Sequence, residues 1–176
     1  MDKGPDRVMG LTLVELVVAM AVLALTVTIA IPAFQGVVER TRATSVYHQL
    51  TASLMLARGA AISRREPVVV CPSEDGLSCR GDAVWDHGWI VFADPGGTGQ
   101  PPHAESILRR GEAPGGGLKV RGTRGRPLAR YFPDGRAPGS NLTLRVCSPR
   151  DELLGRVVIN NVGRARTDRT IIDGAC

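Results

Sequence analysis

The sequence predicts an α+β fold in which one long N-terminal helix packs on antiparallel β-sheet. Three observations support this. Residues 11–31 form an unbroken apolar run, and residues 34–64 repeat apolar positions at helical spacing. The residues after 66 form short strand-like segments separated by turn residues. The 176 residues include 21 glycines and 12 prolines but only 4% aromatics, which is typical of a loop-rich domain with short strands.

The first segment, residues 11–31, has the length and composition of a membrane-spanning helix. At about 1.5 Å per residue its 21 residues extend roughly 31 Å, close to the thickness of a bilayer core. Its one ionisable side chain is Glu15. Because a carboxylate is costly in lipid, Glu15 predicts a functional role with an amine as partner. The alternative is an ordinary secretory signal cut at Ala19–Ala21, which the length of the run and its glutamate disfavour.

The second segment, residues 32–66, continues the helix in amphipathic form. Apolar residues recur at three- and four-residue steps as far as Ala61, with charged and polar residues between them. The pattern predicts one helix that ends at about Arg64 and is interrupted at Pro32. Its single apolar face must be covered by the sheet.

Residues 67–176 carry the strand pattern. The chain without its leader and apolar run has about 145 residues, enough for one domain and too few for two. The clearest case is residues 142–147, where three apolar residues alternate with Thr143 and Arg145, as in a strand with one wet face. Asp94–Gly99 is expected to be a hairpin loop, with a calcium site as the remote alternative. The expected strands are Val68–Cys71, Gly88–Ala93, Ser106–Arg109, Leu118–Arg121, Ala129–Phe132, Leu142–Cys147 and Arg156–Asn160.

Charge is unevenly distributed along the chain. Residues 11–66 carry a net charge of +2, residues 67–106 of −5 and residues 107–176 of +8. Arginine pairs with phosphate through a planar fork, so the basic last part predicts a polyanionic partner. A solvated surface that keeps the protein soluble is the alternative.

The sequence contains no recognisable catalytic set. His48, His87 and His103 have neither triad nor metal-ligand spacing around them, so we expect no enzyme, no cofactor and no metal. Trp85 and Trp89 are expected in the core rather than in a ligand site.

Four cysteines follow the apolar run, and an even number suggests two disulfides outside the cytoplasm. Four cysteines allow three pairings. Zinc binding is the alternative, but no Cys-x-x-Cys pair supports it. The four are Cys71, Cys79, Cys147 and Cys176.

The N-terminus resembles the class III signal of type IV prepilins and type II secretion pseudopilins. The resemblance rests on a short leader ending in Gly10, the junction Gly-Leu-Thr-Leu-Val-Glu at residues 10–15, the apolar helix and Pro32. It implies that prepilin peptidase cleaves between Gly10 and Leu11, that Leu11 is then N-methylated, and that Glu15 and Pro32 serve filament assembly. The sequence departs from the family pattern at one position, because Leu11 stands where phenylalanine is usual.

Further segments resemble the GspH/FimT family of minor pilins and pseudopilins. They are Trp85–Asp94, Ile107–Arg109, Phe132–Gly135, Gly155–Ile159 and Gly163-Arg164, in this order. The resemblance implies a subunit that initiates or caps a type IV pilus or a type II secretion pseudopilus. Its implied partners are other minor and major pilins or pseudopilins, the prepilin peptidase, and the inner membrane before assembly.

The resemblance also implies how the chain is divided. Residues 1–10 are the leader peptide, 11–31 the transmembrane and filament-core helix, 32–66 its amphipathic continuation, and 67–176 a periplasmic β domain. The chain is therefore expected to cross the inner membrane once, with its C-terminal domain in the periplasm, and later to join the filament. A disulfide that ties down the last region is typical of pilins, which favours Cys147 with Cys176 and leaves Cys71 with Cys79.

The segment Gly163-Arg164-Ala165-Arg166 resembles the tail of the FimT-like branch, whose pilins bind extracellular double-stranded DNA in natural transformation. Two arginines at i and i+2 of an extended segment point to one side and can bridge successive phosphates. Arg169 follows closely. The hypothesis is thus a DNA contact through Arg164, Arg166 and Arg169. The alternatives are a plain solvated tail and a secretion pseudopilin of the type II system protein H kind, which serves protein export without binding DNA.

Overall fold

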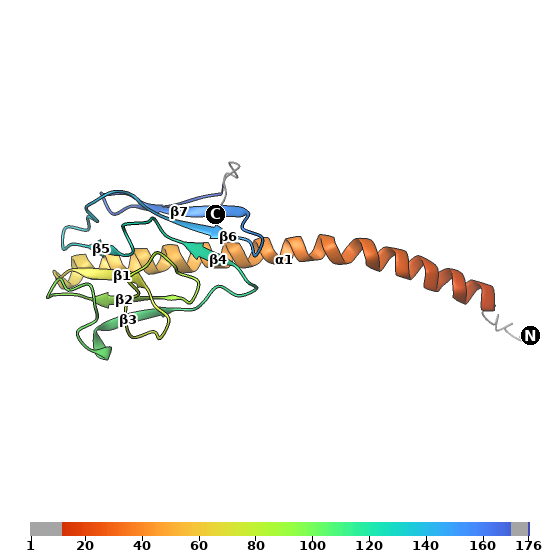
Figure 1. Cartoon of the computed structure of the whole chain (residues 1–176), viewed down its shortest axis with the longest axis horizontal. Helices are drawn as coiled ribbons and strands as arrows, with labels where there is room; N and C mark the ends of the chain where they lie inside the picture. Colours follow the sequence, from red (N-terminus) through yellow and green to blue (C-terminus); the bar gives the residue numbers. More distant parts are fainter. Residues whose placement is uncertain (1–11, 170–175) are drawn as a thin grey trace, which may run out of the picture. The chain divides into compact units, whose positions relative to one another are not determined.

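The structure is a computed structural model that describes residues 12–169 and residue 176 (Figure 1). Its contacts divide the chain into two compact units, one that ends at Val38 and one from Glu39 to Cys176. The helix α1, Leu13–Arg64, contributes to both units. The second unit adds eight strands in two antiparallel sheets, so the predicted α+β class is confirmed.

Helix α1 is 52 residues long and ends at Arg64, as the amphipathic pattern predicts. It begins after Thr12, whose Oγ1 accepts a hydrogen bond from the Glu15 N–H at 3.2 Å. The helix continues through residue 32, so the predicted interruption at Pro32 was wrong. Proline removes one backbone donor, and the hydrogen bonds on both sides still hold a helix of this length.

The first unit contains the apolar half of α1. Its side chains are exposed between Thr12 and Ile31, where glutamate is the single acid. An 18-residue window has a mean hydropathy of 2.5 and no buried residue, and α1 is the one helix of residues 12–169 that is long and apolar enough to cross a membrane. A signal sequence would meet the same criteria of length and composition.

In the second unit, the rest of α1 packs against both sheets (Figure 1). One sheet has the order β3-β2-β1-β5, and the other β4-β6-β7-β8. The strands are β1 Val68–Pro72, β2 Trp89–Ala93, β3 Ile107–Gly111, β4 Lys119–Arg121, β5 Ala129–Tyr131, β6 Leu142–Cys147, β7 Leu153–Ile159 and β8 Ala165–Asp168, with a short 3-10 helix, η1, at Ala104–Ser106.

The core of the second unit is formed by the apolar stripe of α1 and the inward residues of both sheets. The buried helix positions recur every three or four residues: Ala43, Val46, Tyr47, Leu50, Leu54, Ala57 and Ala61. Trp85 and Trp89 are buried in the same core, which confirms their predicted place. The indole Nε1 of Trp89 donates a hydrogen bond of 2.9 Å to Ser53 Oγ on the helix.

All seven predicted strands are present, with ends shifted by up to three residues. The eighth, β8, was missed as a strand, although its residues were expected to be extended. It pairs antiparallel with β7, with Val157 opposite Thr167. Both expected disulfides are present: Cys71 to Cys79, with 5.6 Å between Cα atoms, and Cys147 to Cys176, with 6.1 Å.

Candidate functional site

The three arginines of the predicted DNA contact lie at and around β8. Arg164 precedes the strand, Arg166 lies in it and Arg169 follows it. All three side chains are exposed, and none forms a salt bridge with any residue that the structure describes. Within the described part of the chain, no acidic side chain neutralises these three charges.

The structure separates these arginines rather than clustering them. Arg169 lies over the ring of Tyr47 on α1, 5.9 Å from guanidinium carbon to ring centre, which is a cation–π distance. Arg164 lines a pocket beside the helix. Arg166 pairs with Val158 in the sheet. A ligand that touches all three must follow the strand from one end to the other.

Gly163, the first residue of the Gly-Arg-x-Arg segment, has a structural role. Its φ of +81° is rare for residues with side chains, and an added Cβ would collide with the backbone oxygen of Gly135. The Gly163 N–H donates to the Asn160 carbonyl at 2.9 Å, and Asn160 Oδ1 accepts from the Arg164 N–H at 2.9 Å. The tight turn between β7 and β8 accounts for the glycine without any ligand.

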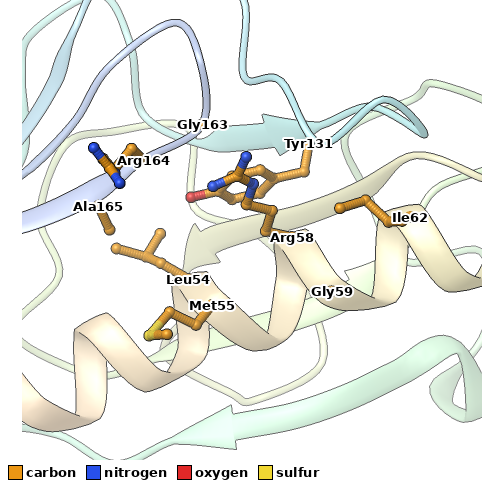
Figure 2. Close-up of a pocket in the computed structure, with 9 residues that line it drawn as sticks. All are labelled: Leu54, Met55, Arg58, Gly59, Ile62, Tyr131, Gly163, Arg164 and Ala165. Carbon is orange, nitrogen blue, oxygen red and sulfur yellow. The ribbon is translucent and has the colours of Figure 1, made fainter.

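Figure 2 shows the pocket lined by Arg164, which has a volume of about 360 Å³. Leu54, Met55 and Ile62 of α1 form its apolar part, and Arg58 of the same helix extends toward Tyr131 of β5. Two arginines beside an apolar surface fit a carboxylate carried on an apolar group.

The phenol of Tyr131 lies at this pocket and is fully buried. Its hydroxyl has no hydrogen-bond partner among the residues that the structure describes. Burial raises the pKa of Tyr131 to about 12, although the positive charges of Arg58 and Arg126 act in the opposite direction. Tyr131 is therefore a neutral donor at physiological pH. This pocket could not be predicted from the sequence, because its residues come from three distant segments.

At the other end of α1, Thr12 and Glu15 form the helix start. The bond from the Glu15 N–H to Thr12 Oγ1 is an N-cap, and a threonine three residues before a glutamate is the capping-box pattern. Thr12 is a capping residue that was not predicted, although the capping-box pattern is visible in the sequence. The predicted cleavage and methylation site, Gly10 and Leu11, lies outside the described residues, and the structure describes Pro32 only through its backbone.

The histidines and the Asp94–Gly99 loop show no arrangement typical of a catalytic or metal site among the described residues. The three histidines are exposed. The buried carboxylate of Asp94 holds its own loop, accepting the N–H groups of Thr98 and Gly99 at 2.9 Å each, and it also pairs with Arg130 at 2.9 Å. These contacts account for the loop in which calcium was the remote alternative. Among the described residues no group of three or more His, Cys, Asp or Glu side chains is placed to hold a metal.

Comparison with solved structures shows the same fold in minor pilins. The type IV minor pilin FimU of Pseudomonas aeruginosa PAO1 matches with a TM-score of 0.60 and 19% identity, over 78% of this chain and 97% of FimU. A second crystal form of FimU matches with a TM-score of 0.57, 19% identity, and coverage of 76% and 98%. The minor pseudopilin EpsH of the Vibrio cholerae type 2 secretion system has a TM-score of 0.47 and 17% identity, over 73% and 94%.

Comparison with curated protein sequences finds no match. A family model described as type II transport protein GspH matches residues 47–163, which is more than half of the chain. The matched region includes the amphipathic part of α1 from Tyr47 and all strands but β8. The chain therefore belongs to the GspH family of type II transport proteins, with a fold like that of a minor pilin.

Proposed function

We propose that the chain is a minor pilin or pseudopilin, a structural subunit that initiates or caps a type IV pilus or a type II secretion pseudopilus. The observation that carries this proposal is a single helix whose two halves have different surroundings. Its first half exposes apolar side chains all round, and its second half is held in a sheet domain of the GspH family. Such a helix suits storage in a membrane and later packing among other helices.

The proposal includes the route into the filament. Prepilin peptidase removes residues 1–10, Leu11 becomes the methylated N-terminus, and residues 11–31 hold the subunit in the inner membrane with residues 67–176 in the periplasm. Glu15 then pairs with the N-terminal amine of a neighbouring subunit, and residue 32 lies where the membrane segment meets the amphipathic segment. The support is the N-terminal resemblance together with the exposed apolar half of α1.

We infer that the neighbouring subunit also contacts α1 at the pocket in Figure 2. Met55 is 66% exposed and Ile62 49% exposed, on a helix whose other side packs against both sheets. Arg58 and Arg164 flank this apolar surface. A pilin surface with apolar side chains and a carboxylate is complementary to it.

Met55→Arg tests this proposal. Because Met55 is exposed, we expect the change to alter the free energy of unfolding by no more than about 0.5 kcal/mol. In cells with the matching filament machinery, the amount of chain in sheared filaments should fall about tenfold, the size expected when a central interface contact is lost. Quantitative immunoblotting of the filament and membrane fractions measures it.

Leu77→Arg is the matched control, since Leu77 is 52% exposed in the small loop closed by Cys71 and Cys79. It should leave incorporation unchanged. An equal fall in filament incorporation for both variants would show that the pocket on α1 is not a specific contact surface. Absence of the wild-type chain from filaments, despite normal processing, would contradict the assembly function itself.

DNA binding is the second candidate function, and it rests on the three exposed arginines around β8 that lack acidic partners among the described residues. Their segment resembles the DNA-binding tail of FimT-like pilins. If this hypothesis holds, the subunit takes up extracellular duplex DNA in natural transformation. If the chain does not bind DNA, the favoured function is that of a pseudopilin in protein export.

Arg164→Ala combined with Arg166→Ala should weaken binding of the full chain, in neutral detergent, to duplex DNA. Each arginine neutralises one phosphate, so the slope of log affinity against log salt should become shallower by about 1.8. Fluorescence anisotropy across a salt series measures the slope. Arg40→Ala with Arg42→Ala, two exposed helix residues, serves as the charge-matched control. No DNA binding by the wild type at about 50 mM salt would eliminate this candidate.

A further inference from the structure

The outer face of sheet β4-β6-β7-β8 carries a row of arginines. Strand register places Arg121 opposite Arg145, Arg145 opposite Arg156, and Arg156 opposite Asp168. Directly opposite residues lie on one face of a sheet with Cβ atoms about 5 Å apart, and like charges in such pairs are destabilising. Three adjacent guanidinium groups therefore require anions nearby.

The outer two arginines of this row have acidic partners. Arg121 forms a salt bridge with Asp86. Arg156 donates from Nε and Nη2 to Asp168 Oδ2, at 3.0 and 2.7 Å. Both positive charges are compensated within the domain.

Arg145 lies between them and has no acidic partner within residues 12–169. None of the described residues accepts a hydrogen bond from its guanidinium group, and its Nε is buried. A buried donor without an acceptor costs free energy, and most such groups in proteins find one. Of the three arginines, Arg145 is therefore the one whose charge no described acidic residue balances.

A hollow of about 540 Å³ opens beside Arg145. Arg156 lines it from the neighbouring strand, and Arg124 lines it from the loop after β4. Arg124 is exposed and forms no salt bridge with a described residue. The polar neutral residues of the lining are Thr123, Asn141 and Thr143. Among the residues that the structure describes, no carboxylate lines the hollow, and its lining is positively charged and rich in donors.

We propose that this hollow, the β6–β7 hollow, binds a phosphate oxyanion between Arg124, Arg145 and Arg156. Guanidinium groups such as those of Arg124 and Arg145 pair with phosphate oxygens through two parallel hydrogen bonds. Arg156 contributes its Nη1, because its Nε and Nη2 donate to Asp168. The three arginines come from one loop and two neighbouring strands, and a phosphate has enough oxygens to accept from all of them. The site uses none of Arg164, Arg166 and Arg169, so it does not rest on the proposed DNA contact.

The same chemistry has two sources, free inorganic phosphate or a phosphodiester of a nucleic acid. Titration of the full chain, in neutral detergent at constant ionic strength, with inorganic phosphate should show saturable binding of one anion by calorimetry. Arg145→Gln should weaken that binding about tenfold or more, the loss expected for a charged hydrogen-bonded contact. Arg136→Gln removes the same charge from an exposed loop and should leave binding unchanged.

Stability without phosphate separates a binding role from a structural one. In chloride buffer, Arg145→Gln should melt no lower than the wild type, because it removes a positive charge opposite Arg156. An arginine that held the sheet together would instead lower the melting temperature when replaced. Arg124→Gln, at an exposed position, is the second variant and should lose phosphate affinity with no change in melting temperature.

Competition between inorganic phosphate and duplex DNA shows which of the two is the ligand. If free phosphate is the ligand, Arg145→Gln binds duplex DNA as the wild type does. If a phosphodiester is the ligand, duplex DNA displaces inorganic phosphate, and the variant loses affinity for both. No saturable phosphate binding, wild-type affinity in both hollow variants, or equal loss in Arg136→Gln would overturn the proposal.

Discussion

Glu15→Leu should leave the chain inserted in the membrane and remove it from the filament. The substitution makes the apolar half of α1 more apolar, so insertion is not impaired. In the proposed assembly, the carboxylate pairs with the N-terminal amine of a neighbouring subunit, and a buried charge without its partner costs several kcal/mol. We expect at least a tenfold fall of the chain in sheared filaments, with the membrane fraction correspondingly enriched.

Two further variants separate this pairing from helix capping. Thr12 and Glu15 form an N-cap, so part of the effect could come from a weakened helix start. Glu15→Gln keeps a side chain that suits a capping box but has no charge, and it should fail as Glu15→Leu does. Thr12→Ala weakens the cap alone and should assemble. Normal assembly of Glu15→Gln would show that Glu15 acts as a cap.

Trp89→Ala should give the largest loss of stability in the sheet domain. The side chain is 1% exposed in the core, and its indole N–H donates to Ser53 on α1, so it joins β2 to the helix. Truncation of a buried tryptophan costs about 3–5 kcal/mol, a large part of the stability of a domain of this size. Urea denaturation followed by far-ultraviolet circular dichroism measures the change.

Ser53→Ala isolates the hydrogen bond, since it leaves the indole N–H buried without an acceptor. It should cost about 1–3 kcal/mol, less than the tryptophan truncation. A loss below about 1 kcal/mol for Trp89→Ala would mean that the tryptophan is not the contact between β2 and the helix.

Sequence patterns predicted the parts of the fold that depend on local periodicity. The end of α1 at Arg64 follows from the apolar repeat, and seven strands follow from apolar runs between turns. Strand β8 could not be identified in this way, because its four residues, Ala-Arg-Thr-Asp, include no large apolar side chain and it is held by pairing with β7. Pro32 does not interrupt α1 as predicted, since one lost hydrogen bond does not end a long helix.

The candidate sites were less accessible from sequence, because tertiary pairing creates them. Arg145 and Arg156 face each other only through the register of β6 and β7, which shifts at Val146/Cys147. The pocket at Tyr131 joins three segments that are more than 25 residues apart. The Gly-Arg-x-Arg segment was visible in the sequence, but only the turn geometry shows that its glycine is needed for the fold.

The mass of the mature N-terminal peptide tests the central claim most directly. The claim is that this chain enters a filament by the prepilin route. The full chain would be produced together with a prepilin peptidase, recovered from membranes, and digested for mass spectrometry. We expect an N-terminal peptide that starts at Leu11 and carries one additional methyl group. A peptide that starts after Ala21, or an intact chain that still starts at Met1, would contradict it.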